Sequence, residues 1–148
     1  MGTGLILRIP KALHDEMLAH CQRQYPKEAC GLLGGRDGAA GQVYPMRNIE
    51  ESPIGYAMDP KEQLQVEKQM RQRAQRLIGI YHSHTASSAY PSLVDVRLAI
   101  SPDVSYILVS LKDRALPELK SYRIDGQTIT PEAVEIVGPE SARRIGSG

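Results

Sequence analysis

Apolar residues in the first part of the chain change from a strand-like to a helical spacing. Residues 5–9 form a short apolar run typical of a strand, and Pro10 suits the first turn of a following helix. The next apolar residues recur every four positions, at Leu13, Met17 and Cys21. This spacing predicts a helix with one buried face that ends near Tyr25. His14 and His20 lie off that face, so we expect both to face solvent.

The next segment contains a hairpin pattern followed by turn residues. Strands are expected at 29–33 and 42–47, joined through Asp37 and Gly38, a dipeptide typical of a tight hairpin turn. Residues 48–60 contain prolines and a glycine and predict an irregular connection.

The second half of the chain alternates helices with strands. Five apolar positions mark one side of a Gln- and Arg-rich helix: Leu64, Val66, Met70, Ala74 and Leu77. Strands are expected at 77–82 and 104–111, with an apolar helix at 93–100 between them. The remaining strands are expected as a hairpin and an edge strand, at 119–124, 128–129 and 134–137. This order predicts an α/β fold in which helices cover both faces of a mixed sheet.

The composition is that of an ordinary globular domain. The chain has 148 residues, 41% hydrophobic and 24% charged, which predicts one domain over residues 1–140 and a flexible tail at 141–148. A net charge of +1 offers no basic field for nucleic acid or an anionic membrane. Cys21 and Cys30 form no disulfide-type or CxxC pattern, and no apolar run approaches the ~20 residues of a membrane span. We therefore expect a cytoplasmic protein without nucleic-acid or membrane partners.

Two histidines at the end of the strand at 77–82 are the strongest chemical signal. His82 and His84 are two residues apart, so in a strand their side chains share one face, with Cβ atoms about 6.6 Å apart. Asp95 follows in the first turn of the next helix and is a candidate third ligand. Two imidazoles, one carboxylate and an open fourth position are typical of a catalytic zinc site.

Other interpretations of these residues exist. The segment from Ser92 to Asp95 has the pattern of a helix capping box, in which the carboxylate would bond the first amide of the helix. An iron facial triad would place the carboxylate beside one of the histidines, and here it is distant. A zinc nucleobase deaminase would require HxE and PCxxC, which the chain lacks.

The candidate residues fit a longer array: Glu28 before a strand, then His82, Ser83, His84, seven residues, Ser92, two residues and Asp95. The array resembles the JAMM signature of the JAB1/MPN/Mov34 metallopeptidases, and the resemblance extends over residues 5–137. It implies a three-layer α/β/α MPN domain, similar to cytidine deaminases in fold. Within the family, the chain is most similar to short bacterial members.

The resemblance also implies a role for each residue. His82, His84 and Asp95 would bind one Zn²⁺ per chain, with water at the fourth position. Glu28 would be the general base and then the acid for the leaving amine, and Ser92 would donate a hydrogen bond to the developing oxyanion. Tyr56 and Met58 alternate in the irregular segment and either line a groove for an extended peptide or simply pack.

The implied activity is hydrolysis after the C-terminal Gly-Gly of a small ubiquitin-like sulfur-carrier protein, for example release of cysteine from a carrier–cysteine adduct. Two alternatives are an isopeptidase resembling deubiquitinases and a non-catalytic MPN scaffold. Cys30 is expected to be a small buried residue, with a redox role as the alternative. The sequence allows either a monomer or a homodimer.

Overall fold

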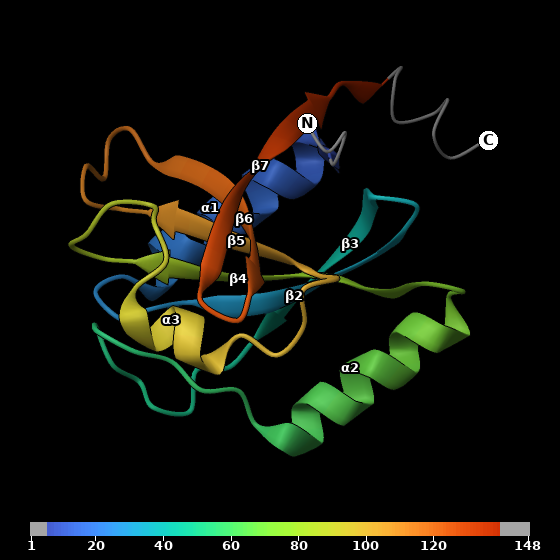
Figure 1. Cartoon of the computed structure of the whole chain (residues 1–148), viewed down its shortest axis with the longest axis horizontal. Helices are drawn as coiled ribbons and strands as arrows, with labels where there is room; N and C mark the ends of the chain where they lie inside the picture. The colour runs from blue at the N-terminus through green and yellow to red at the C-terminus, as the bar shows by residue number, and fades with distance from the viewer. Residues whose placement is uncertain (1–5, 140–148) are drawn as a thin grey trace.

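The computed structural model describes residues 6–139, which form seven strands and three helices (Figure 1). In chain order these are β1 (Ile6–Pro10), α1 (Lys11–Gln24), β2 (Cys30–Arg36), β3 (Ala39–Met46), α2 (Pro60–Gln72), β4 (Arg76–His84), α3 (Leu93–Leu98), β5 (Ser105–Ser110), β6 (Glu118–Asp125) and β7 (Thr128–Val137). The expected elements are therefore present in the expected order. The predicted tail at 141–148 lies outside the described residues.

The hairpin of β2 and β3 forms where the turn dipeptide predicts it. Asp37 and Gly38 have φ values of 53° and 75°, the left-handed pair that a tight hairpin turn requires. β2 pairs with β4 on its other side, and in this register Gly31 lies opposite Tyr81. A Cβ atom on residue 31 would lie 2.2 Å from Cε1 of Tyr81. Glycine is required there because the Tyr81 ring lies against the backbone of β2.

The strands form one mixed sheet that closes on itself, in the order β1-β3-β2-β4-β5-β6-β7. Closure depends on β1, which pairs in parallel with β7 along its whole length and touches β3 at one register position, Arg8 with Ala39. The expected mixed sheet with flanking helices is therefore confirmed, but the flat middle layer of a three-layer α/β/α sandwich is replaced by a closed barrel. The predicted edge strand at 134–137 is in fact the second half of β7, which lies between β6 and β1.

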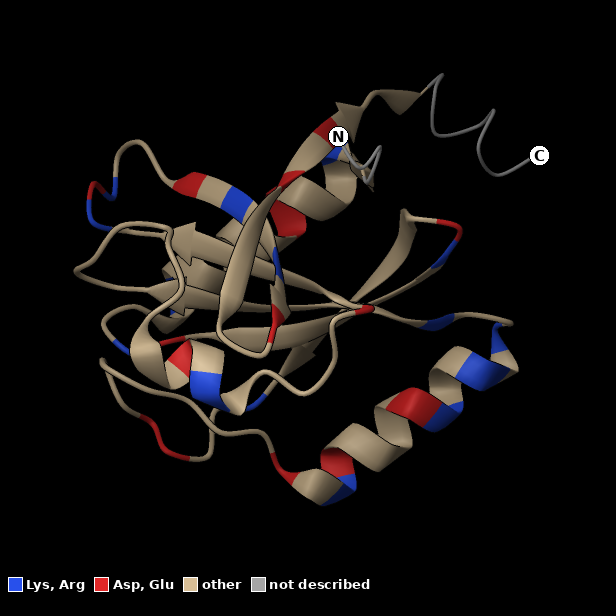
Figure 2. Ribbon diagram, in the orientation of Figure 1, with Lys and Arg blue, Asp and Glu red and all other residues tan. Residues whose placement is uncertain are grey.

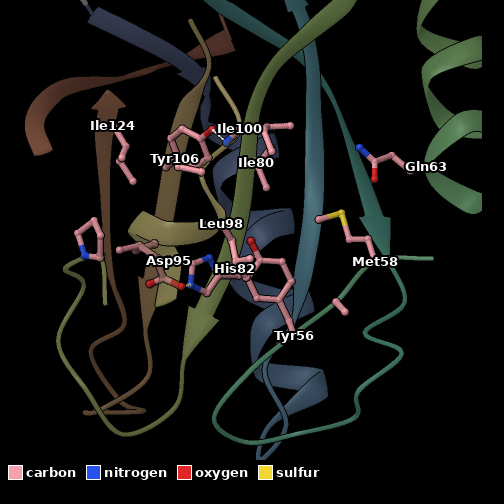
Figure 3. A pocket seen from close by; sticks show the side chains of 14 residues that line it. Tyr56, Met58, Gln63, Ile80, His82, Asp95, Leu98, Ile100, Tyr106 and Ile124 are labelled. Atoms are coloured by element: carbon pink, nitrogen blue, oxygen red, sulfur yellow. Dashed lines mark hydrogen bonds and ion pairs between the residues drawn. The ribbon is translucent and has the colours of Figure 1, made fainter. Parts of the chain in front are cut away.

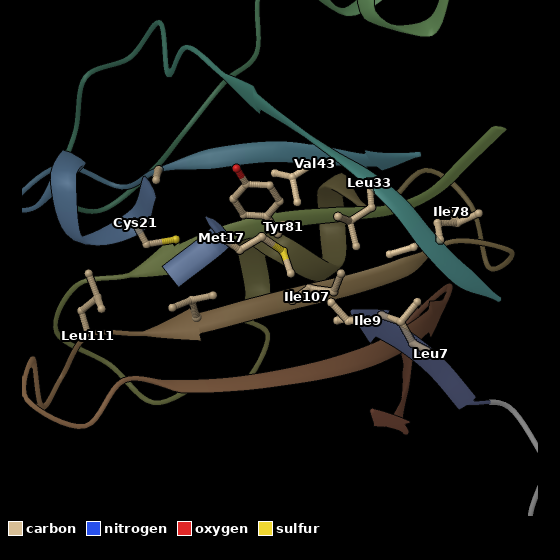
Figure 4. Packing of buried hydrophobic residues seen from close by; sticks show 13 residues of the cluster. Leu7, Ile9, Met17, Cys21, Leu33, Val43, Ile78, Tyr81, Ile107 and Leu111 are labelled. Atoms are coloured by element: carbon tan, nitrogen blue, oxygen red, sulfur yellow. The ribbon is translucent and has the colours of Figure 1, made fainter. Parts of the chain in front are cut away.

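Two hydrophobic clusters cover opposite faces of the central strands. The first lies between α1 and the face that carries Tyr81 and Ile107, and includes Met17 and Cys21 of the predicted helix face (Figure 4). The second lies between α2 and the opposite face, where Leu32 and Ile80 contact the helix side chains. Helix α1 is thus positioned by its predicted apolar stripe.

Two predictions about side-chain exposure are wrong, and one predicted helix is too long. His20 is buried, at 5% exposure, because its ring contacts Tyr81 of β4. Leu64 is 67% exposed, since it lies off the face of α2 that buries Val66 and Met70. Ala74 and Leu77 were expected on this helix, but it ends at Gln72 and Leu77 belongs to β4.

Helix α2 carries charges of both signs along its exposed side (Figure 2). They are Lys61, Glu62, Glu67, Lys68 and Arg71. Across residues 6–139, every helix is too short or too polar to cross a lipid bilayer.

Candidate metal centre and its clefts

The two histidines of the array lie at the carboxyl end of β4, a strand that lies between β2 and β5. His82 and His84 are each 5% exposed, and their Nε2 atoms are 3.2 Å apart. The alternation of a strand explains this convergence, since residues two apart point to the same face. Ser83 points the other way, and its Oγ accepts a hydrogen bond from the backbone N–H of Ala29 at 2.8 Å. This bond ties β4 to the segment that carries Glu28.

Asp95 joins the two histidines from helix α3. One carboxylate oxygen lies 3.1 Å from Nε2 of His82 and the other lies 3.0 Å from Nε2 of His84. The capping box is also present: the Asp95 carboxylate accepts from the Ser92 N–H at 2.9 Å, and the Ser92 hydroxyl accepts from the Asp95 N–H at 3.1 Å. The two interpretations of Asp95 therefore coexist, because a carboxylate has enough lone pairs for both.

The donor set fits a divalent metal ion. Ligand atoms of His82, His84 and Asp95 all lie within 4.8 Å of one another. Nδ1 of His84 lies 2.9 Å from the carbonyl oxygen of Ser88 and donates to it, so Nε2 is the ring nitrogen that faces Asp95 and would bind a metal. Sequence reasoning missed Ser88, because a backbone carbonyl leaves no residue-type signal.

The electrostatics of the centre favour positive charge. Burial alone raises the pKa of Asp95, but hydrogen bonds from His82 and His84 outweigh burial and hold that pKa far below its usual range. Burial lowers the pKa of His84, yet the hydrogen bonds to Asp95 and to the Ser88 carbonyl raise it overall. For His82, burial dominates and lowers the pKa, which favours the neutral ring that binds metals. Asp95 is therefore ionised, in a site suited to a cation.

Glu28 lies just before β2 and is 7% exposed. Burial raises the pKa of its carboxyl group to about 7, against an ordinary value of 4.5, although the nearby His84 lowers it. Together with His84, Ser92 and Asp95, it lines a cleft of about 370 Å³, which we call the polar cleft after these four side chains. A carboxyl group with a pKa near neutrality is suited to both accepting and returning a proton.

The Ser92 side chain is available to a substrate. Its oxygen accepts the capping hydrogen bond from Asp95, which uses a lone pair and not the hydroxyl hydrogen. Helix capping and hydrogen-bond donation by Ser92 are therefore compatible.

A second cleft lies on the other side of His82 and Asp95, with a volume of about 220 Å³ (Figure 3). This apolar cleft is lined by side chains that include Met58, Ile80, Leu98, Tyr106 and Leu108. The Tyr56 ring stacks on the His82 ring, with centroids 4.6 Å apart and planes inclined by 29°. Tyr56 borders both clefts and Met58 lines the apolar cleft, and both side chains also pack against the second cluster. Binding of an extended peptide by these residues stays a prediction.

Two other features limit the chemistry. Cys30 is fully buried, and burial raises the pKa of its thiol to about 12, so it is a packing residue, as expected. Strand β4 has a neighbour on both sides, so a peptide has no free strand edge to pair with beside His84. The extended residues 55–58 lie next to the clefts instead.

Comparison with known proteins agrees with this geometry. Residues 10–125 match the family described as prokaryotic homologs of the JAB domain. The chain is 45% identical to the CysO-cysteine peptidase of Mycobacterium tuberculosis, over 92% of this chain and 94% of that protein. It is 38% identical to a probable TtuB-protein conjugate cleaving protease of Thermus thermophilus, over 65% of each chain. A solution structure of a protein from Desulfitobacterium hafniense superposes with a TM-score of 0.82 at 40% identity, covering 89% of this chain and 93% of that one.

Proposed function

The chain belongs to the family of prokaryotic JAB-domain proteins, and from that premise we propose that it is a zinc-dependent peptidase. Its substrate is a ubiquitin-like sulfur-carrier protein, and it cleaves the bond after the carrier's C-terminal Gly-Gly. The observation that carries the proposal is the convergence of His82, His84 and Asp95 beside a cleft that also contains Glu28 and Ser92. A metal centre with an adjacent proton-transfer group and a hydrogen-bond donor can catalyse amide hydrolysis.

In this proposal, His82, His84 and Asp95 would hold the metal. A bound zinc ion would supply Lewis acidity, which lowers the pKa of a water molecule toward ~7 and polarises the scissile carbonyl. Zinc suits two imidazoles and one carboxylate better than magnesium or calcium, which prefer sets made of oxygen ligands alone.

The remaining steps belong to the side chains. Glu28 takes a proton from the attacking water as the water oxygen bonds to the carbonyl carbon of the terminal glycine. The Ser92 hydroxyl donates a hydrogen bond to the carbonyl oxygen as negative charge develops on it. Glu28 then gives its proton to the amine nitrogen as the C–N bond breaks. Carrier carboxylate and free amine are the products.

The two clefts suggest how the substrate lies. Glu28 must reach the leaving amine, so the polar cleft is assigned to the leaving group and the apolar cleft to the carrier tail. The tail would run past Tyr56 and Met58, next to the extended residues 55–58. Glycines at the cut allow the backbone to approach the metal closely. Both cysteines are free and buried, consistent with the reducing cytoplasm in which we place the reaction.

An isopeptidase that acts on protein conjugates is the second candidate. The polar cleft favours it in one respect, since it is open at its rim toward the exposed side chains of Ile54 and Val94 and accommodates more than a single amino acid. The carrier end of the substrate is the same in both cases, and only the amine differs.

The test is incubation of the protein with a β-grasp carrier that bears a cysteine after its Gly-Gly, followed by mass spectrometry. We expect the wild type to remove the cysteine from the carrier and the Glu28→Gln variant to leave it in place. Cleavage of diubiquitin without action on the carrier adduct would overturn the substrate assignment. An equally active Glu28→Gln variant would overturn the assignment of the general base.

A further inference from the structure

The side chain of Asn48 lies at the centre of the irregular segment between β3 and α2, and it is 8% exposed. Its Nδ2 donates to the backbone carbonyls of Glu28 and Gly55, each at 3.0 Å. Its Oδ1 accepts from the backbone N–H groups of Glu50 at 3.0 Å and Ala57 at 3.1 Å. All four hydrogen-bonding positions of one amide side chain are therefore used, and each goes to the main chain.

Two of these bonds enclose Tyr56. The Gly55 carbonyl belongs to the peptide unit before Tyr56, and the Ala57 N–H belongs to the peptide unit after it. Because both flanking peptide units are held by the same side chain, the direction of the Tyr56 side chain is set by Asn48. That side chain is the ring that stacks on His82.

A third bond reaches Glu28. Asn48 holds the carbonyl of Glu28, and the N–H of Glu28 donates to the Ser52 carbonyl at 2.8 Å. The peptide units on both sides of Glu28 are thus bound to the segment that Asn48 organises. Thr85, just after the metal-binding histidines, donates to the Pro53 carbonyl at 2.8 Å and fastens the same segment to the end of β4.

We propose that Asn48 is a positioning residue for the reaction: its amide sets the placement of Glu28 and Tyr56 relative to the metal centre. The inference rests on the proposed function, since it concerns the group assigned as general base. Asn48 itself acts through main-chain bonds and lines neither cleft. Proton transfer depends steeply on placement, and a displacement of about 1 Å can cost roughly 10²-fold in rate.

Only an asparagine side chain makes this set of bonds. An aspartate has the same shape and keeps both acceptor bonds, but its carboxylate would face the carbonyl oxygens of Glu28 and Gly55 without a donor. An alanine loses all four bonds and leaves buried main-chain groups unpaired. Asn48→Asp should therefore cause a smaller defect than Asn48→Ala, because it loses two of the four hydrogen bonds and not all four.

The experiment measures kcat, KM, zinc content and thermal unfolding for Asn48→Ala and Asn48→Asp on the carrier–cysteine adduct. Zinc content should stay at the wild-type level, since the ligands lie on β4 and α3. We expect kcat to fall by about 10- to 100-fold in Asn48→Ala, with a smaller change in KM. Ser121→Ala is the matched control, because Ser121 lies on β6, two strands from β4 and outside both clefts. It removes a buried hydrogen bond to Glu132 and should leave kcat within about 2-fold.

A second comparison separates positioning from general loss of stability. In the Glu28→Gln background, Asn48→Ala should change the residual kcat by less than about 2-fold, because Glu28 is already disabled and displacement of Tyr56, which lines both clefts, should appear in KM. If Asn48→Ala does not fold, Asn48→Asp carries the same test. Equal losses of kcat with and without Glu28, or wild-type kcat in both Asn48 variants, would overturn the positioning role. Full activity of Glu28→Gln alone would instead overturn the assignment of Glu28 as general base in the proposed function, on which this inference rests.

Discussion

Glu28 combines burial with a carboxyl group, a combination that costs stability. Its pKa is raised to about 7 by burial, above the ordinary 4.5, so the folded state binds the proton more tightly than the unfolded state does. The carboxyl group therefore destabilises the fold progressively as pH rises from about 4.5 through 7. A group kept in such an environment is a candidate for function, because function tolerates a local loss of stability.

Replacement of Glu28 by glutamine should therefore have two opposite effects. Activity should fall by about 10²- to 10⁴-fold, because the amide cannot accept a proton. The metal-free protein at pH 8 should gain about 1–3 kcal/mol in free energy of unfolding, because a buried charge is removed. Kinetics on the carrier adduct measures the loss of activity, and urea unfolding in the presence of a chelator measures the gain in free energy of unfolding. A variant that loses both stability and activity would indicate a structural role for Glu28.

His20 makes the fold sensitive to acid. Its Nδ1 is hydrogen-bonded to the Tyr81 hydroxyl at 2.7 Å, and burial lowers its pKa to about 4 from 6.5, with a smaller effect from Arg23. The unfolded state binds the proton more tightly, so the stability contributed by neutral His20 is complete above pH 6.5 and is lost as pH falls toward 4. The loss should be about 3 kcal/mol.

Urea unfolding of wild type and His20→Asn between pH 7 and pH 4 measures this contribution. Asparagine keeps a polar side chain at the position but does not titrate, so the variant should show a shallower decline in stability with acid. Parallel declines in the two proteins would show that other groups cause the acid sensitivity.

Helix α3 is held by its ends more than by its sides. None of its six residues is buried, and Leu93 is 83% exposed, so the capping box of Ser92 and Asp95 is its main local stabilisation. The helix nevertheless carries Asp95, the proposed third metal ligand, and borders both clefts through Leu98. A helix this short and exposed is held in position mainly by the site to which it contributes.

Substitution of Ser92 tests both of its roles. Ser92→Ala removes the cap and the proposed donor, and should lower kcat by about 10²- to 10³-fold while costing about 1 kcal/mol in stability. Ser92→Thr retains a hydroxyl for both and should lose much less. Steady-state kinetics and thermal unfolding of the two variants provide the comparison. An unchanged kcat in Ser92→Ala would contradict the assignment of Ser92 as the hydrogen-bond donor to the oxyanion.

We expect the fold of the whole molecule to be independent of the metal. The first cluster, which contains Met17, Tyr81 and Ile107, lies against α1 on the face of the sheet opposite the metal centre. We therefore expect a chelator to abolish activity while leaving the far-UV circular dichroism unchanged, and added zinc to restore activity.

Elemental analysis gives the stoichiometry. About one zinc per chain is expected for the wild type, with a large loss in His82→Ala and Asp95→Ala. Equal zinc in all three proteins would contradict the ligand assignment, and unfolding by the chelator alone would contradict the independence of the core.

Local order along the chain was sufficient to predict most of this protein. Apolar periodicity predicts α1 through Met17 and Cys21, and the turn dipeptide at Asp37 predicts the first hairpin, because both depend on residues close in sequence. The spacing of His82 and His84 predicts their convergence for the same reason, since a strand's alternation is a local property.

Only the tertiary structure decided the contacts between segments that are far apart in sequence. Closure of the sheet joins β1 to β7, and burial of His20 depends on Tyr81, a residue 61 positions away. The organising role of Asn48 depends on main-chain groups of Glu28, which a residue-type pattern does not encode. Such pairings depend on the packing free energy of the whole chain, because distant segments compete for the same partners. Local periodicity cannot predict the outcome of that competition.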